Sequence, residues 1–336
     1  AGRLGARRGD KSLKDVWLYA LHRRCREQLQ KEVPAPLTPR RIEQSLARED
    51  WCVGEMGGLD LGDRRRTKRA AAILGARWKN PQASFYGSFS KWSQAKGAYA
   101  LIEHKGPELS YDRLLSGHQQ ATQQRMAAES VVLLAQDTTG LNYSGLLKTT
   151  GLGSLGNAKG QGLWLHSLVT IRPDGVPLGV LEAQCWGRET LEANETQRGR
   201  NAKSIDEKES YRWIQSYQCA AAAARRMPQT QLVVMADREA DLYELHQAAA
   251  DAPPNLHTLV RAQHNRHLTS HQKLWDHMAA LPCGERRTVD LPRRSGQPAR
   301  TAEVELRWDQ VEIKPPAVGC KKSWPPVMIW VVWVHE

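Results

Sequence analysis

A short apolar run that leads to an aspartate occurs twice in this sequence, and it limits the folds that the chain can adopt. Leu232 to Met235 is apolar and leads to Asp237, and Val131 to Ala135 is apolar and leads to Asp137. Runs of this length are typical of strands buried on both faces, and open α/β sheets bind ligands at the carboxyl ends of such strands. We therefore expect both aspartates at strand ends of an α/β sheet.

Two carboxylates held at such ends would repel each other in a dry site unless a cation neutralised them. A hard divalent ion with oxygen ligands meets this need, so the sequence predicts that Asp137 and Asp237 form half of a metal site. The alternative is that each aspartate only caps the helix or turn that follows it. The repetition of the pattern gives the two interpretations equal weight.

Charge and hydropathy limit the class of partner. The 336 residues carry a formal net charge of +12, which favours a polyanionic partner, nucleic acid more than a membrane surface. The sequence has no apolar run near the length of a membrane span and no signal-peptide pattern, so we expect a cytoplasmic protein. The six cysteines form no CxxC pair, which argues against a zinc site and against a disulfide framework.

A basic cluster lies at the start of a predicted helix. Asp63 is a good N-cap for a helix that extends to about Trp78. Cations in the first turns oppose the helix dipole, which makes sense if a phosphate docks there, although charge alone slightly favours a solvated basic face. The cluster comprises Arg64, Arg65, Arg66, Lys68 and Arg69.

Other stretches predict further elements. A second helix, about Lys91 to His104, places Trp92, Ala95, Tyr99 and Ile102 on one stripe, which we assign to the hydrophobic core and not to a base-stacking surface.

Near the N-terminus, an amphipathic helix is expected over about Leu13 to Lys31, followed by a proline-rich linker at 34–41. GLGSLG (151–156) satisfies a dinucleotide-binding pattern but leads into a strand instead of a helix, so we interpret it as a loop. The strands Leu163 to Ile171 and Val176 to Gln184 flank a turn signal and predict a hairpin.

Five strings occur in the order QDTTGLNY (136–143), GLWLHS (162–167), DEKESYRW (206–213), ADREADLYE (236–244) and LVRAQHNR (259–266), after WCVGEMGGLDLGDRRRTKR (51–69). Together they closely resemble the DNA transposases of the IS4 group, to which the Tn5 transposase belongs. The resemblance extends over about Trp51 to Glu336.

The resemblance implies an α/β fold with a ribonuclease-H-like core, a mixed sheet with helices, that carries an Asp-Asp-Glu triad and two magnesium or manganese ions. Asp137 and Asp237 match the first two members of the triad. The third lies, in the family, in a helix after the strand matched here by Trp330 to Val334, and the chain ends at Glu336 before it. We therefore expect a chain truncated before its catalytic glutamate, and an inactive one as it stands.

The resemblance also divides the chain. We expect an unassigned basic extension and linker at 1–50, a helical DNA-binding domain at 51–125, the first part of the catalytic core at 126–266, a β-rich insertion at 267–325 and a returning core strand at 326–336.

Four further residues acquire a role from the resemblance. Arg261, His264 and Arg266 match a stretch that contacts DNA near the active site, and Trp330 matches a tryptophan that stacks on a flipped base. His166, on a predicted core strand, is expected to be a core histidine or to support the site from behind.

The function expected from these observations is cut-and-paste DNA transposition by metal-dependent strand cleavage and strand transfer. Its partners would be double-stranded DNA, both the transposon end repeats and the target, with a homodimer on DNA in the full-length protein, no membrane, and a nucleoid-associated location in a bacterial cytoplasm. The alternative is a catalytically inactive transposase-derived remnant or inhibitor that binds DNA through its basic helix.

Overall fold

The computed structural model describes residues 14–20, 51–56, 58–146, 148–156, 160–188, 203–293, 297–317 and 319–336. The linker predicted at 34–41 lies outside these residues. The strands are β1 (Lys14–Ala20), β2 (Val131–Asn142), β3 (Gly153–Ser154), β4 (Gln161–Ile171), β5 (Pro177–Trp186), β6 (Gln231–Ala236), β7 (Leu256–Arg261), β8 (Glu285–Leu291), β9 (Arg300–Ile313) and β10 (Val327–His335).

The helices in the described residues are α3 (Trp51–Met56), α4 (Arg64–Lys79), α5 (Trp92–Ile102), α6 (Tyr111–Ala127), α8 (Tyr211–Arg226), α9 (Tyr243–Ala250) and α10 (Leu274–Ala280). Short 3-10 turns are η1 (Tyr86–Ser88), η2 (Pro107–Leu109), η3 (Arg238–Ala240) and η4 (Gly319–Ser323).

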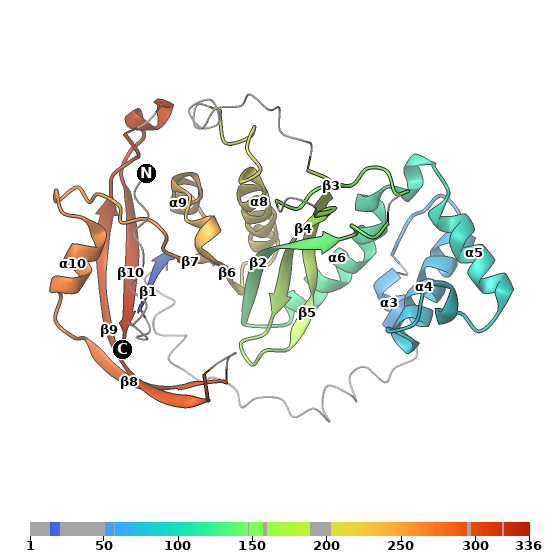
Figure 1. Ribbon diagram of the computed structural model, residues 1–336, viewed down its shortest axis with the longest axis horizontal. Coiled ribbons are helices and arrows are strands. Elements are labelled where there is room, and N and C mark those ends of the chain that lie inside the picture. Colours follow the sequence, from blue (N-terminus) through green and yellow to red (C-terminus); the bar gives the residue numbers. More distant parts are fainter. Residues whose placement is uncertain are drawn as a thin grey trace.

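One mixed sheet runs through the described part of the chain, in the order β3-β4-β2-β6-β7-β1-β10-β9-β8, with β5 paired to β4 (Figure 1). The pairs β2–β6 and β6–β7 are parallel, whereas β4 and β5 form the predicted antiparallel hairpin next to β2. The predicted α/β class is therefore confirmed. The mixed sheet with helices is compatible with a ribonuclease-H-like core, which remains a prediction.

Helix α8 packs against the central strands and forms the largest hydrophobic cluster with them. Its alanines Ala220, Ala223 and Ala224 are fully buried, because side chains this small let the helix approach the sheet closely. Trp213 and Leu134 fill the space between helix and sheet and are also buried.

The N-terminal prediction is wrong over Lys14–Ala20, which form strand β1 and not a helix. β1 pairs antiparallel with β7 on one side and with β10 on the other. The stretch is rich in β-branched and aromatic residues, and backbone hydrogen bonds to two neighbouring strands override its helical periodicity.

The segment predicted as a β-rich insertion, 267–325, contains the strands β8 and β9. β9 is one continuous strand whose pairing with β10 continues through Asp309, which lies opposite Val331. The final strand is confirmed as β10.

The predicted core stripe of the second helix is confirmed for Ala95 and wrong for its large residues Trp92, Tyr99 and Ile102. In α5 the buried residues are Ala95, Ala98 and Leu101, whereas Trp92 and Ile102 are 63% and 61% exposed. The small residues let α5 pack closely against α4, which turns the large side chains outward.

Three polar side chains join the helical segment to the sheet. Glu55 of α3 is buried, forms an ion pair with Arg125 of α6 at 2.5 Å, and lies 2.8 Å from Nδ1 of His118 in the same helix. His118 Nε2 accepts the Val180 N–H of β5, and Arg125 Nε donates to the Leu178 carbonyl of the same strand. Helices α3 and α6 are thereby fixed to the edge strand β5.

Candidate nucleic-acid interface and carboxylate pair

The basic helix α4 begins as predicted. Asp63 is its N-cap, and the carboxylate oxygen Oδ1 accepts the Arg65 N–H at 2.8 Å. Arg64, Lys68 and Arg69 are exposed, as is Arg65, so four of the five predicted cations are accessible.

Arg66 is the fifth cation, and its guanidinium is engaged within the protein. It donates to the Leu61 carbonyl at 3.0 Å and to Glu108 Oε1 at 2.6 Å. The Glu108 backbone amide, His104 and Arg66 lower the pKa of the Glu108 carboxyl to about 2. Arg66 therefore ties the start of α4 to the turn before α6, and its contact with DNA stays a prediction.

The positive charge extends beyond the predicted cluster. From Arg64 to Ile102 the sequence contains no Asp or Glu. Cations occur throughout this stretch, namely Arg64, Arg65, Arg66, Lys68, Arg69, Arg77, Lys79, Lys91 and Lys96. A surface with this charge attracts polyanions over its whole length, not only at the helix start.

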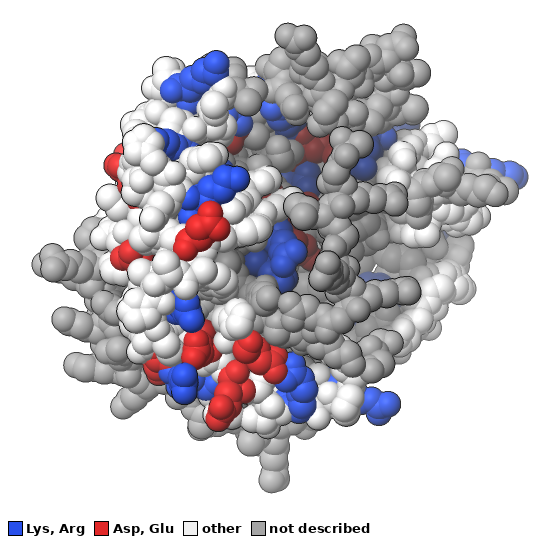
Figure 2. Space-filling model, turned by 60° about the vertical axis from the view of Figure 1, so that its left-hand side comes forward, with Lys and Arg blue, Asp and Glu red and all other residues white. Residues whose placement is uncertain are grey.

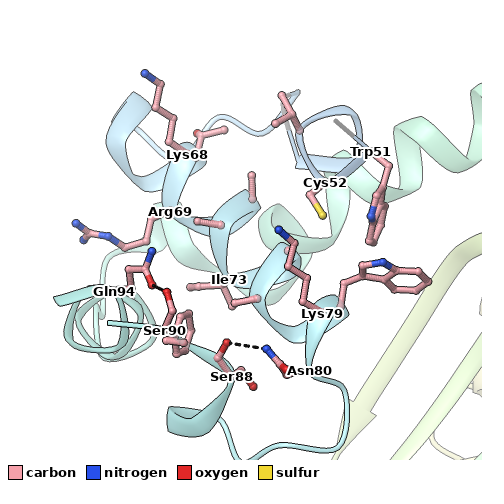
Figure 3. A pocket seen from close by; sticks show the side chains of 18 of the residues that line it. Trp51, Cys52, Lys68, Arg69, Ile73, Lys79, Asn80, Ser88, Ser90 and Gln94 are labelled. Carbon is pink, nitrogen blue, oxygen red and sulfur yellow. Dashed lines mark hydrogen bonds between the residues drawn. The ribbon is translucent and has the colours of Figure 1, made fainter. Parts of the chain in front are cut away.

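A groove of about 1520 Å³ runs along α4 between α3, α5 and the loop after η1. Figure 3 shows Lys68 and Arg69 at one end, Ile73 in the middle and Trp51 at the other end. The Trp51 ring meets Trp78 edge-on, with centroids 5.2 Å apart. The groove thus combines cationic and aromatic walls, which suit the phosphates and sugars of a nucleic acid.

Arg77 shapes this groove, and sequence reasoning missed it. Its guanidinium donates to the Ala83 carbonyl at 2.6 Å, to Ser88 Oγ at 2.7 Å and to the Pro81 carbonyl at 3.1 Å. These bonds fold the 80–88 loop back onto α4. An arginine in the last turn of a predicted helix was the available signal.

The parallel pair β2–β6 carries both predicted aspartates at one end. Val131 lies opposite Gln231 and Ala135 opposite Met235. Asp137 lies in β2 two residues past Ala135, and Asp237 directly follows the last residue of β6, so both lie at the same end of the strand pair. Both residues are exposed.

The ends of the two strands differ from the prediction. β2 does not end at Asp137 but continues to Asn142, so Asp137 is not an N-cap. Asp237 does cap η3, because its Oδ1 accepts the Glu239 N–H at 2.9 Å. The capping alternative therefore holds for one aspartate and is wrong for the other.

The pair fits a divalent cation in part. Asp137 and Asp237 offer oxygen ligands from adjacent strands, and neither forms an ion pair within the described residues. Among the described residues no group of three or more His, Cys, Asp or Glu side chains could hold a metal ion. A metal centre at this pair needs at least one further ligand.

A buried polar chain lies behind Asp137. Arg212 Nε donates to Thr138 Oγ1 at 3.0 Å, and Thr138 Oγ1 lies 2.8 Å from His166 Nδ1. His166 Nε2 in turn faces Gln136 Oε1 at 3.4 Å. Burial and the Arg212 charge lower the pKa of His166 to about 4, so this histidine is neutral near pH 7.

These hydrogen bonds show to which face of the sheet the Asp137 side chain points. Thr138 faces α8 through Arg212, and adjacent residues of a strand point to opposite faces of the sheet. Asp137 therefore lies on the face of the sheet away from α8. The prediction of His166 as a core histidine is consistent with its burial and with its contacts to Thr138 and Gln136.

The loop after β7 holds the residues that the family resemblance connects with DNA. Asp241 is buried and accepts the backbone N–H groups of Gln263 and His264 at 2.8 and 2.9 Å. Burial would raise the pKa of Asp241, but the hydrogen bond from His246 and the charge of Arg266 outweigh it and lower that pKa.

Arg266 therefore has a structural role. Its side chain is 9% exposed and pairs with Asp241, and its contact with DNA stays a prediction. His264 is exposed and Arg261 lies at the end of β7, next to β1. For both, contact with DNA stays a prediction.

Trp330 lies in the middle of β10, opposite Gln310 of β9. Val327, Ile329 and Val331 are the buried residues of the strand, so Trp330 points to the other face, where it is partly exposed. A role in stacking on a base stays a prediction.

Comparison with known families supports the nucleic-acid interface. Residues 48–106 match the family described as transposase DNA-binding. Every residue that lines the α4 groove falls inside this match. The match supports a transposase-related function for this part of the chain, with DNA as its partner. A search among curated proteins found no match. No helix in the described ranges is long and apolar enough to cross a membrane.

Proposed function

We propose that the protein is a DNA transposase of the Asp-Asp-Glu type, similar to the IS4 group, which cuts and joins double-stranded DNA at the ends of a mobile element. The observation that carries this proposal is the placement of Asp137 and Asp237 at the same end of the parallel strand pair β2–β6, in a chain whose residues 48–106 match a transposase DNA-binding family.

In this proposal the groove along α4 holds the duplex through Arg64, Arg65, Lys68 and Arg69, whose exposed side chains reach phosphates. Asp137 and Asp237 contribute two ligands to a pair of magnesium or manganese ions, and a third carboxylate is required. When bound, such ions activate an attacking oxygen and stabilise a leaving oxygen at phosphorus. The full-length protein would act as a homodimer on DNA.

The proposal assigns a positioning role to three residues behind the carboxylate pair, Thr138, His166 and Arg212. Their hydrogen bonds fix the position of β2 next to Asp137.

A DNA-binding remnant or inhibitor is the second candidate. It is favoured by the lack of a third metal-binding group beside the two aspartates among the described residues. Such a protein would bind duplex DNA through α4 without any metal-dependent chemistry.

Plasmid nicking distinguishes the two candidates. We expect the full-length protein to nick supercoiled DNA in Mn²⁺, and Asp137→Asn or Asp237→Asn to abolish nicking while DNA affinity stays within about twofold. The matched control is Asp290→Asn, an exposed carboxylate of β8, which should leave nicking unchanged. Nicking that survives in both active-pair variants would refute the assignment.

A further inference from the structure

The outer side of η1 and α5 carries aromatic rings that no core residue covers. Trp92, Tyr86 and Tyr99 are 63%, 53% and 39% exposed, and we call these three residues the aromatic surface. The Tyr86 and Trp92 rings lie 6.0 Å apart, and Phe85 packs edge-on against Tyr99 at 5.1 Å. The rings are thus grouped and supported from below, unlike scattered surface aromatics.

Cations are interleaved with these rings. Trp92, Lys96 and Tyr99 follow a spacing of four and three residues, which places them on one face of α5, and Lys91 directly precedes the helix. Lys91 and Lys96 are both exposed.

The aromatic surface is continuous with the α4 groove. Phe85 also contacts Phe89, with ring centroids 5.4 Å apart, and Phe89 lines the groove. A strand of nucleic acid held in the groove can therefore extend onto the aromatic surface and remain next to positively charged residues throughout.

The positive charge around the aromatic surface favours a polyanion over a second copy of the chain as its binding partner. A second copy of the chain would bring the same cations against one another, because a twofold interface pairs a patch with itself. No acidic residue between Arg64 and Ile102 could offset that repulsion. A polyanion meets no such penalty.

Among polyanions, the rings select one with accessible bases. A cationic groove that follows the backbone, beside exposed aromatic rings, is the arrangement by which proteins bind single strands, since each base offers a face for stacking. In an intact duplex the base faces are stacked on one another and are not accessible. Unpaired bases next to a duplex satisfy both parts of the site.

We propose that the aromatic surface stacks unpaired bases that adjoin the duplex held in the α4 groove. The inference rests on the proposed DNA-binding function and names the form of DNA that this part of the protein prefers: a duplex with a single-stranded extension.

Fluorescence anisotropy with two labelled DNAs tests the proposal: a blunt duplex, and the same duplex extended by about four unpaired nucleotides. The protein is expected to bind the extended DNA at least about fivefold more tightly, since one stacked base contributes that much. Trp92→Ala combined with Tyr86→Ala should remove this preference and leave the affinity for the blunt duplex unchanged. Trp92→Phe should retain most of the preference.

Trp275→Ala is the matched control, because Trp275 of α10 is 40% exposed but lies in the β-rich insertion. Equal affinity of the protein for the two DNAs would overturn the inference, as would an equal loss for both DNAs in the double variant. So would a self-association, seen by sedimentation, that depends on Trp92. If Lys68→Ala still weakens binding to both DNAs in those cases, the proposed DNA binding stands and only the aromatic surface has been misassigned.

Discussion

Single residues explain where the chain differs from its local sequence pattern. The placement of Asp137 and Asp237 could be predicted because each follows its own apolar run, and the two runs pair in parallel as β2 and β6. The structural roles of Arg66 and Arg266 could not be predicted, because their partners are Glu108 and Asp241, which lie far from them in the sequence. Local patterns identify a cation but not the carboxylate that neutralises it.

His166 makes the stability of the folded protein depend on pH through a single side chain. Its pKa in the folded protein is lowered to about 4, first by burial and then by the charge of Arg212. A histidine in the unfolded chain titrates near its ordinary value of about 6.5. Between these two values the unfolded state binds a proton that the folded state does not, so stability falls as the pH drops through this window.

We therefore expect the free energy of unfolding to lose about 3 kcal/mol from His166 between about pH 6.5 and pH 4. His166→Gln should remove this part of the loss, and urea denaturation at a series of pH values measures it. His267→Gln, at an exposed histidine, is the control and should leave the profile unchanged. Parallel profiles for the protein and His166→Gln would contradict this account.

At the scale of elements, helix boundaries follow from local chemistry and buried faces follow from packing. The start of α4 was predictable because the Asp63 cap is a local signal. The buried face of α5 was not, because alanines lie against α4 while Trp92 faces outward. β1 was mistaken for a helix because its hydrogen bonds come from β7 and β10, which are distant in the sequence.

The α4 helix carries a prediction of its own. Each phosphate contact made by a cation adds to the steepness with which affinity falls as salt rises. Lys68→Ala and Arg65→Ala should each weaken duplex binding and reduce the slope of log affinity against log salt by about 1. Anisotropy titrations at several salt concentrations give this slope.

Arg286→Ala is the control for these variants, because Arg286 is an exposed cation of β8 that is paired with Glu305. It should leave both affinity and slope unchanged. A slope that Lys68→Ala and Arg65→Ala do not alter would place the duplex elsewhere on the protein.

Two parts of the molecule differ in the charge of their surfaces. Around α4 and α5 the charge is of one sign, whereas the side that carries β8, β9 and α10 shows acidic and basic groups interspersed (Figure 2). On that side Arg286 pairs with Glu305, and Arg287 with Glu285. Long-range attraction of DNA is therefore expected from the helical segment, while the sheet carries the carboxylate pair.

In the proposed function, one bound duplex reaches both the α4 groove and the carboxylate pair. Iron(II) accepts the oxygen ligands that hold magnesium, and with added hydrogen peroxide and ascorbate it generates hydroxyl radicals that cut only the DNA beside it, so the positions of the cuts locate the pair on the duplex. We predict focused cuts at one place in the bound duplex, lost in Asp137→Asn and in Asp237→Asn although both still bind DNA. Cuts that are spread along the duplex, or unchanged in these variants, would contradict the claim.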